Sequence, residues 1–133
     1  MVARSSSNLR RFGLELLLAM ASVPALAQVP VAKPFIGKWS VEWQPDQQRY
    51  DAVMVITETG GTWQTYIRRR SNPCAGREVQ LQRDKVTPDT LEMTLKFEDA
   101  IPGCKNARVR LQVDDKGTVT GKRSEHELQL KRD

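Results

Sequence analysis

Residues 91–98, LEMTLKFE, alternate apolar and polar side chains at every position. Successive side chains of a β-strand point to opposite faces. Every second side chain from Leu91 to Phe97 is therefore expected on one face, with polar side chains on the other. The stretch is predicted to be a strand with one face in a hydrophobic core.

The same alternation recurs along the chain, and turn-forming residues such as Pro45-Asp46, Thr87-Pro88-Asp89 and Pro102-Gly103 separate the stretches. No window shows a helical period. The other alternating stretches are residues 39–44, 52–57, 63–68, 78–82, 108–113, 118–122 and 126–131.

These stretches predict an all-β fold of about eight antiparallel strands in up-and-down order, closed as a barrel or folded as a sandwich. We favour the barrel, because closure removes edge strands and no helix is expected to cover them.

Gly60-Gly61 lies between two of the alternating stretches and predicts a two-residue hairpin turn. That turn would place Ile56 opposite Thr65 and Met54 opposite Ile67. The register gives one mostly apolar face, made of Ala52, Met54, Ile56, Trp63, Thr65 and Ile67.

Residues 1–27 are predicted to be a cleaved signal peptide. Arginines precede an apolar run at 16–23 that is too short to span a bilayer, and Ala25-Leu26-Ala27 suits cleavage before Gln28. The Arg10-Arg11 pair leaves twin-arginine export open beside the general route, and an uncleaved anchor is the third alternative. We expect a protein exported to the bacterial periplasm or secreted, without a membrane span.

The full chain has 133 residues and a net charge of +5. Without residues 1–27, which hold three arginines and one glutamate, 106 residues remain with 18 basic and 15 acidic side chains, a net charge of +3. We expect residues 28–35, with Pro30 and Pro34, to form an extended arm, and residues 36–133 to form a single barrel domain.

Cys74 and Cys104 are the two cysteines of the chain. Export would expose them to an oxidising compartment, so we predict a disulfide between them. A bridge closing a loop of about 30 residues would stabilise the domain by about 3.5 to 4 kcal/mol on the chain-entropy treatment. A redox-active pair normally lies closer in sequence, so we assign these cysteines a structural role.

Gly37-Lys38-Trp39 at the start of the first strand resembles the Gly-x-Trp signature of the calycin group, the lipocalins and avidins. The resemblance implies that Trp39 plugs the barrel base and packs against an arginine, here Arg132 or Arg123. The chain is shorter than a typical lipocalin and lacks the other signature segments. The expected architecture is also similar to that of small periplasmic metalloprotease inhibitors, although their disulfide lies earlier in the barrel.

Few residues suggest catalysis. His126, the single histidine, lies between Glu125 and Glu127. It falls on the same side of the predicted strand as Leu128 and Leu130, which are expected to point inward, so we expect a rim or core position. The carboxylate pairs Glu98-Asp99 and Asp114-Asp115 are expected at turns. No metal-ligand spacing, phosphate-binding loop or nucleic-acid motif is present in the sequence. We predict a protein that is not an enzyme and uses no cofactor.

A group of basic residues surrounds the two cysteines and would gather at one end of the domain if the disulfide forms. Such a surface could bind a polyanion or an acidic envelope protein, and the competing interpretation is a solubilising surface. Its members are Arg68, Arg69, Arg70, Arg77, Lys105, Arg108 and Arg110.

Two further binding hypotheses follow from the predicted fold. A calycin-like barrel could bind a small apolar ligand, although the three tryptophans and many aliphatic side chains are expected to fill so small an interior. The arm at residues 28–35 could act as the reactive segment of an enzyme inhibitor.

Overall fold

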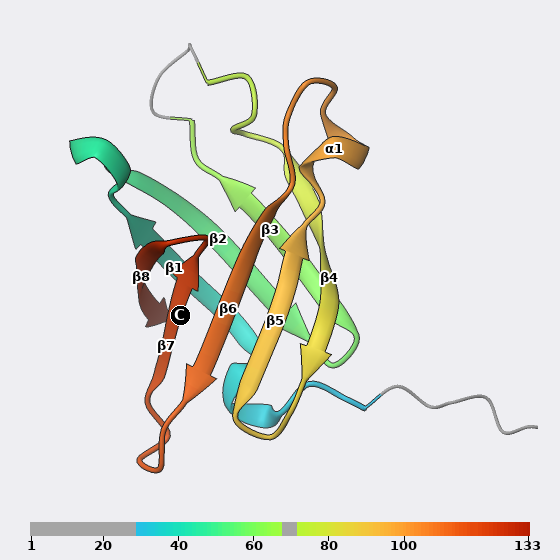
Figure 1. Ribbon diagram of the computed structural model, residues 1–133, viewed down its shortest axis with the longest axis vertical. Helices are drawn as coiled ribbons and strands as arrows, with labels where there is room; N and C mark the ends of the chain where they lie inside the picture. Colours follow the sequence, from blue (N-terminus) through green and yellow to red (C-terminus); the bar gives the residue numbers. More distant parts are fainter. Residues whose placement is uncertain (1–28, 68–71) are drawn as a thin grey trace, which may run out of the picture.

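The computed structural model describes residues 29–67 and 72–133, and the predicted leader and Arg68–Arg70 lie outside these ranges. Eight strands wind around a common axis (Figure 1). They are β1 (Gly37–Trp43), β2 (Tyr50–Thr57), β3 (Gly60–Thr65), β4 (Glu78–Val86), β5 (Thr90–Leu95), β6 (Ala107–Val113), β7 (Val119–Arg123) and β8 (His126–Arg132). Two 3-10 turns, η1 (Lys33–Phe35) and η2 (Pro45–Gln47), and a single helical turn, α1 (Phe97–Ala100), complete the described elements.

The sheet is a closed barrel in which every strand pairs with its neighbour in the sequence, and β1 pairs with β8. All pairs are antiparallel, and Val41 opposite Leu130 lies in the closing pair. Of the two predicted architectures, the barrel is therefore correct. Closure satisfies the backbone groups that an edge strand would leave unpaired.

The inward face of β5 shows how alternation builds the core. Leu91, Met93 and Leu95 are all buried, as predicted. Phe97 is buried too, but the strand ends at Leu95 and Phe97 begins α1. A helix of one turn has no measurable period in the sequence, which is why α1 was not expected and why Glu98-Asp99 were assigned to a turn.

The β2–β3 turn lies two residues before its predicted position, which shifts each cross-strand partner by four residues. The turn is Glu58-Thr59, and Gly60 and Gly61 are strand residues opposite Thr57 and Ile56. Gly61 has φ of 146°, and a Cβ there would lie 2.0 Å from the Val55 carbonyl oxygen. Glycine thus permits a close approach of the two strands, a role that the sequence pattern does not separate from a turn.

An even shift in register keeps each side chain on its own face. Met54, expected opposite Ile67, is opposite Trp63, and both side chains are buried. Thr65 is also buried and accepts a hydrogen bond from the Trp63 indole Nε1, at 2.9 Å. Ile67 lies beyond the end of β3 and is 62% exposed, so its assignment to the apolar face is wrong.

The segment before β1 is packed against the barrel. Val31 and Phe35 are buried, and the Val31 backbone N–H donates to the Glu58 carbonyl at 3.1 Å. The expectation of an extended, unpacked arm is therefore wrong for residues 31–35, because two apolar side chains in the segment find space under the barrel. In Figure 1 this segment crosses the lower end of the barrel.

The same end holds the tryptophan of the Gly-x-Trp motif. Trp39 is buried, and its indole Nε1 donates to the Phe35 carbonyl at 2.9 Å. The guanidinium carbon of Arg132 lies 4.2 Å from the Trp39 ring centroid. The Arg132 guanidinium also donates to the carbonyls of Ile36, at 2.6 Å, and Pro34. We call Val31, Phe35, Trp39 and Arg132 the barrel base.

The predicted disulfide is present between Cys74 and Cys104, whose Cα atoms are 5.8 Å apart. Cys104 is buried and follows α1, whereas Cys74 lies in the segment that leads to β4. The bridge therefore joins two long connections at the end of the barrel opposite the base. Arg77 adds a second link between these connections, because its Nη1 donates to the Ala100 carbonyl at 2.8 Å.

Candidate binding site at the open end of the barrel

The end of the barrel opposite the base is open and contains a cleft of about 300 Å³. Several strands end or begin here, together with η2, α1 and the disulfide connections, at the upper end in Figure 1. We call this cleft the barrel mouth. Its lining residues are Trp43, Pro45, Tyr50, Thr65, Asn72, Cys74, Phe97, Arg123 and His126.

Arg123 is the last residue of β7, and its side chain points into the barrel. In the β6–β7 register it lies opposite Val109, which is buried, so Arg123 belongs to the inward-facing set. Its guanidinium carbon lies 4.8 Å from the Trp43 ring centroid, 5.5 Å from that of Trp63 and 5.4 Å from that of Phe97. Three aromatic rings thus surround one cation.

Burial changes the electrostatics of this arginine. Desolvation lowers the pKa of Arg123 from its usual value to about 10, and the nearby Tyr50 partly opposes that change. A pKa of about 10 still leaves the guanidinium charged at neutral pH. The mouth therefore holds a positive charge that has lost part of its hydration.

The Arg123 guanidinium has no hydrogen bond or ion pair with the described residues, although it carries five N–H donors. The described residues that line the mouth include no aspartate or glutamate. Buried charges in proteins are normally paired, so a partly buried arginine beside open space is an unusual feature.

One wall of the mouth is aromatic. Trp43 and Tyr50 are opposite each other in the β1–β2 register, and their rings stack with centroids 5.3 Å apart and planes 17° apart. Trp63 lies behind Trp43, at 5.5 Å between ring centroids and a tilt of 55°. The stack presents apolar surface beside the cation, since Tyr50 is only partly buried.

His126 begins β8, directly opposite Arg123 in the β7–β8 register. The residue is exposed and lines the mouth, which is the rim position that we considered for it. Among the described residues no group of three or more His, Cys, Asp or Glu side chains could hold a metal ion.

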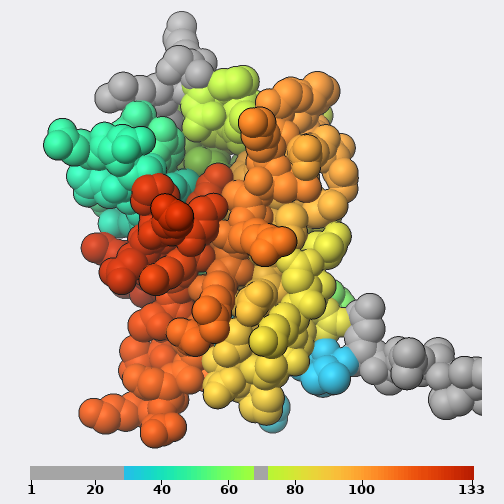
Figure 2. Space-filling model, in the orientation of Figure 1, coloured from blue at the N-terminus to red at the C-terminus, as the bar shows by residue number. Residues whose placement is uncertain are grey.

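The basic residues named from the sequence lie mainly outside the mouth. Arg68, Arg69 and Arg70 fall outside the described residues. Arg108 and Arg110 project from the outer face of β6, and the Arg110 Nε lies 3.8 Å from Glu92 Oε2. Arg77 and Lys105 are exposed on the disulfide connections near the mouth. The structure therefore spreads the described members over an end and a side of the barrel; Figure 2 shows the side formed by β5 to β7.

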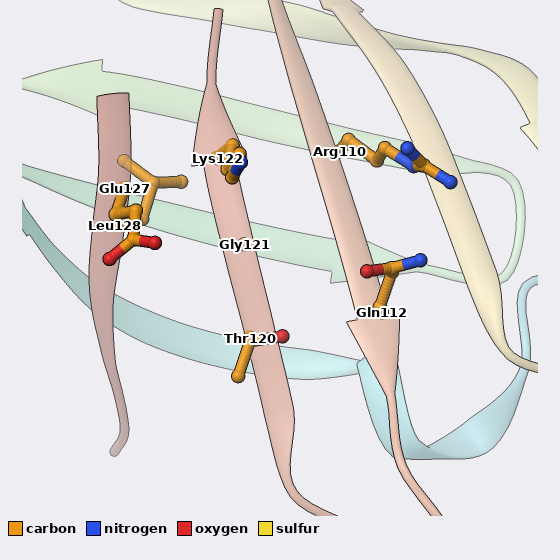
Figure 3. Close-up of a pocket in the computed structure, with 7 residues that line it drawn as sticks. All are labelled: Arg110, Gln112, Thr120, Gly121, Lys122, Glu127 and Leu128. Carbon is orange, nitrogen blue, oxygen red and sulfur yellow. The ribbon is translucent and has the colours of Figure 1, made fainter. Parts of the chain in front are cut away.

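A second recess, of about 340 Å³, lies on the outer face of β6 to β8 (Figure 3). Its polar side chains are spread over three strands and do not converge on one point, as Figure 3 shows. Lys122 is opposite Glu127 in the register, and Arg110 lies beside Glu92. Because both cations face an acid, this recess offers a weaker charge than the mouth does.

Sequence reasoning considered Arg123 only as an alternative partner for the Trp39 ring, a position that Arg132 occupies. The available signal was parity, since Gly121 and Arg123 share one side of a short strand. Val119 is the one apolar side chain on that side, and a single valine beside a glycine and an arginine does not mark an inward face, so the sequence pattern did not reveal that Arg123 points into the barrel.

The geometry defines a class of protein: a small, closed, eight-stranded antiparallel barrel with one disulfide, a plugged base and an open, cationic mouth. The barrel is compatible with a calycin-like architecture. No protein-family model matches the chain, and no curated protein or solved structure matches it either. Within residues 29–67 and 72–133, no helix is long and apolar enough to cross a membrane.

Proposed function

We propose that this chain is an exported, non-catalytic binding protein that holds an anionic ligand, or an acidic group of a larger partner, in the barrel mouth. The observation that carries the proposal is Arg123, a partly buried guanidinium that lines an open cleft without a carboxylate beside it. Anion recognition is the chemistry that best accounts for a charge kept in this position.

The energetics favour an anion over a neutral ligand. Contacts with aromatic rings stabilise a cation by about 0.5 to 2 kcal/mol, which offsets only part of the free energy lost when the cation is dehydrated. A carboxylate or phosphate would accept hydrogen bonds from the guanidinium, each contributing about 1.5 to 3 kcal/mol. A neutral apolar ligand would instead remove water from the Arg123 guanidinium without replacing those bonds.

The three binding hypotheses drawn from the sequence are not equally consistent with this site. Arg77 and Lys105 lie near the mouth and would steer an anionic envelope protein or polyanion toward it. A ligand deep in the barrel is disfavoured, because Met54 and Trp63 are fully buried in the core. The inhibitor hypothesis is disfavoured because it needs a free N-terminal arm, whereas Val31 and Phe35 are packed against the barrel.

The proposal is tested by NMR on isotope-labelled, disulfide-bonded protein titrated with acetate and then with inorganic phosphate. Sodium chloride maintains a constant ionic strength. We expect saturable shifts at the Arg123 Nε–H and the Trp43 indole N–H. The Arg123→Met variant keeps the aliphatic stem without the charge, and it should show no saturable shift at Trp43.

Arg108→Met is the matched control, because Arg108 is an exposed arginine on the outer face of β6. It should bind as the parent protein does. Loss of binding in the Arg108 variant, with binding kept in the Arg123 variant, would place the site on the basic outer surface instead. Absence of saturable shifts with either anion would reject the proposal.

A further inference from the structure

We propose that the ligand of the mouth is a small aromatic carboxylate, whose carboxylate pairs with Arg123 and whose ring packs against Tyr50 and Trp43. This inference rests on the proposed function and specifies its ligand class. It combines three properties of the mouth: the geometry of the cation, the shape of the neighbouring wall and the space available.

The cation favours a carboxylate. A guanidinium presents its donors in a planar fork that matches the two oxygens of a carboxylate, and two parallel bonds then fix the orientation of the ligand. Arg123 is surrounded by Trp43, Trp63 and Phe97, so its position is restricted before the ligand arrives. A preorganised site binds more tightly because less conformational freedom is lost on binding.

The wall favours an aromatic ring. Trp43 and Tyr50 both line the mouth, and their rings are stacked with planes 17° apart, so Tyr50, which is only partly buried, forms the outer ring of an aromatic stack. Aromatic rings pack against one another in offset or edge-to-face geometry and are stabilised beyond the burial of area alone. A flexible alkyl chain would lose more rotamer freedom on the same surface.

The space favours a short ligand. A volume of about 300 Å³ is at the lower limit of small-molecule sites. Below the mouth the interior is occupied, since Trp63 and Phe97 are buried against the core. A long acyl chain has no room to extend into the barrel, whereas one ring with a short carboxylate arm fits in the mouth.

Isothermal titration calorimetry on the disulfide-bonded protein tests the inference with four probes: 3-phenylpropanoate, its neutral amide, hexanoate and inorganic phosphate. We expect 3-phenylpropanoate to bind at least about tenfold more tightly than the amide, which lacks the charge. It should also bind about threefold to tenfold more tightly than hexanoate, which lacks the ring. Phosphate should bind more weakly than 3-phenylpropanoate.

Two tyrosine variants supply the matched test of the wall. Tyr50→Leu should weaken 3-phenylpropanoate about threefold to tenfold and leave hexanoate almost unchanged. Tyr66→Leu is the control, because Tyr66 is an exposed tyrosine that does not line the mouth. Arg123→Met should abolish the preference for the carboxylate over the amide.

The outcomes separate this inference from the proposed function. If hexanoate or phosphate binds as tightly as 3-phenylpropanoate or more tightly, the ligand is not an aromatic carboxylate. If that binding is also lost in Arg123→Met, the anion site at Arg123 still stands. Equal binding of the amide and the carboxylate, or no binding of any anion, would overturn both. If Tyr50→Leu keeps the parent protein's preference for 3-phenylpropanoate over hexanoate, Tyr50 does not form the wall against which the ligand ring packs.

Discussion

Each end of this barrel holds an arginine over a tryptophan ring, but the two guanidinium groups differ in their hydrogen bonds. At the base, Arg132 lies over Trp39, and its guanidinium donates to two backbone carbonyls. At the mouth, Arg123 lies over Trp43 without any hydrogen bond to the described residues. The base arginine is satisfied by the protein itself, whereas the mouth arginine still has its donors available.

The comparison teaches that a cation over an aromatic ring does not by itself indicate a binding site. What distinguishes the ends is the pairing of the remaining donors. The 3-10 turn before β1 closes the base with Phe35, and the carbonyls of Pro34 and Ile36 accept hydrogen bonds from Arg132. No comparable segment of the described chain closes the mouth, so Arg123 borders a cleft. We therefore expect base substitutions to change stability and mouth substitutions to change binding.

The largest effect is expected at the plug of the base. Replacing Trp39 with alanine removes a buried ring, its hydrogen bond to the Phe35 carbonyl and the contact with Arg132. We expect the free energy of unfolding to fall by about 3 to 5 kcal/mol, measured by urea denaturation. A loss below about 1 kcal/mol would show that the base is not the structural end of the barrel.

Removal of the disulfide should have the next largest effect. The double variant Cys74→Ser, Cys104→Ser is expected to lose about 3.5 to 4 kcal/mol of stability, because the unfolded chain regains the freedom of a loop of about 30 residues. Binding of 3-phenylpropanoate should weaken as well, since Cys74 lines the mouth. Calorimetry at a temperature where the variant is folded would measure the second effect, and unchanged affinity would show that the bridge does not shape the mouth.

A smaller loss of stability is expected from Arg132→Met. The variant removes the contact with Trp39 and leaves the carbonyls of Ile36 and Pro34 to water, at a cost of about 1 to 2 kcal/mol. Urea denaturation measures the loss, and the affinity for 3-phenylpropanoate should stay the same. Weakened binding in this variant would contradict the separation of the two ends.

Arg123→Met should change stability least. A partly buried charge without a partner contributes little to folding, and an apolar side chain of similar length is expected to be neutral or slightly stabilising, within about 1 kcal/mol. Binding should be lost in the same variant. Destabilisation as large as that of Arg132→Met would mean that Arg123 is a structural residue, and the proposed function would then lose its main support.

The sequence predicted much of the fold from local patterns. Alternation along residues 91–97 and 108–113 marked the inward faces correctly, and Cys74 and Cys104 form the predicted bridge. The Gly60-Gly61 signal placed the turn two residues after its observed position, because glycine serves close strand approach as well as turns. Phe35, assigned to an extended arm, is buried, because its burial depends on space that the closed barrel creates.

The site was less accessible to sequence reasoning. The basic residues named from the sequence were selected because they lie near the cysteines in the chain, yet Arg108 and Arg110 project from the outer face of β6. Arg123 was considered only as a partner of Trp39. Its position depends on the β7 register with both neighbouring strands, which is a property of the whole sheet.

The amino-acid sequence by itself determined the all-β class, the number of strands and the disulfide, because alternation and cysteine content are local or compositional properties. Only the tertiary structure decided which arginine is satisfied and which is not. Arg123 and Arg132 are nine positions apart and chemically identical. Closure of the barrel places one beside the carbonyls of a packed segment and the other beside a cleft lined by rings, and that difference in surroundings determines which end can bind an anion.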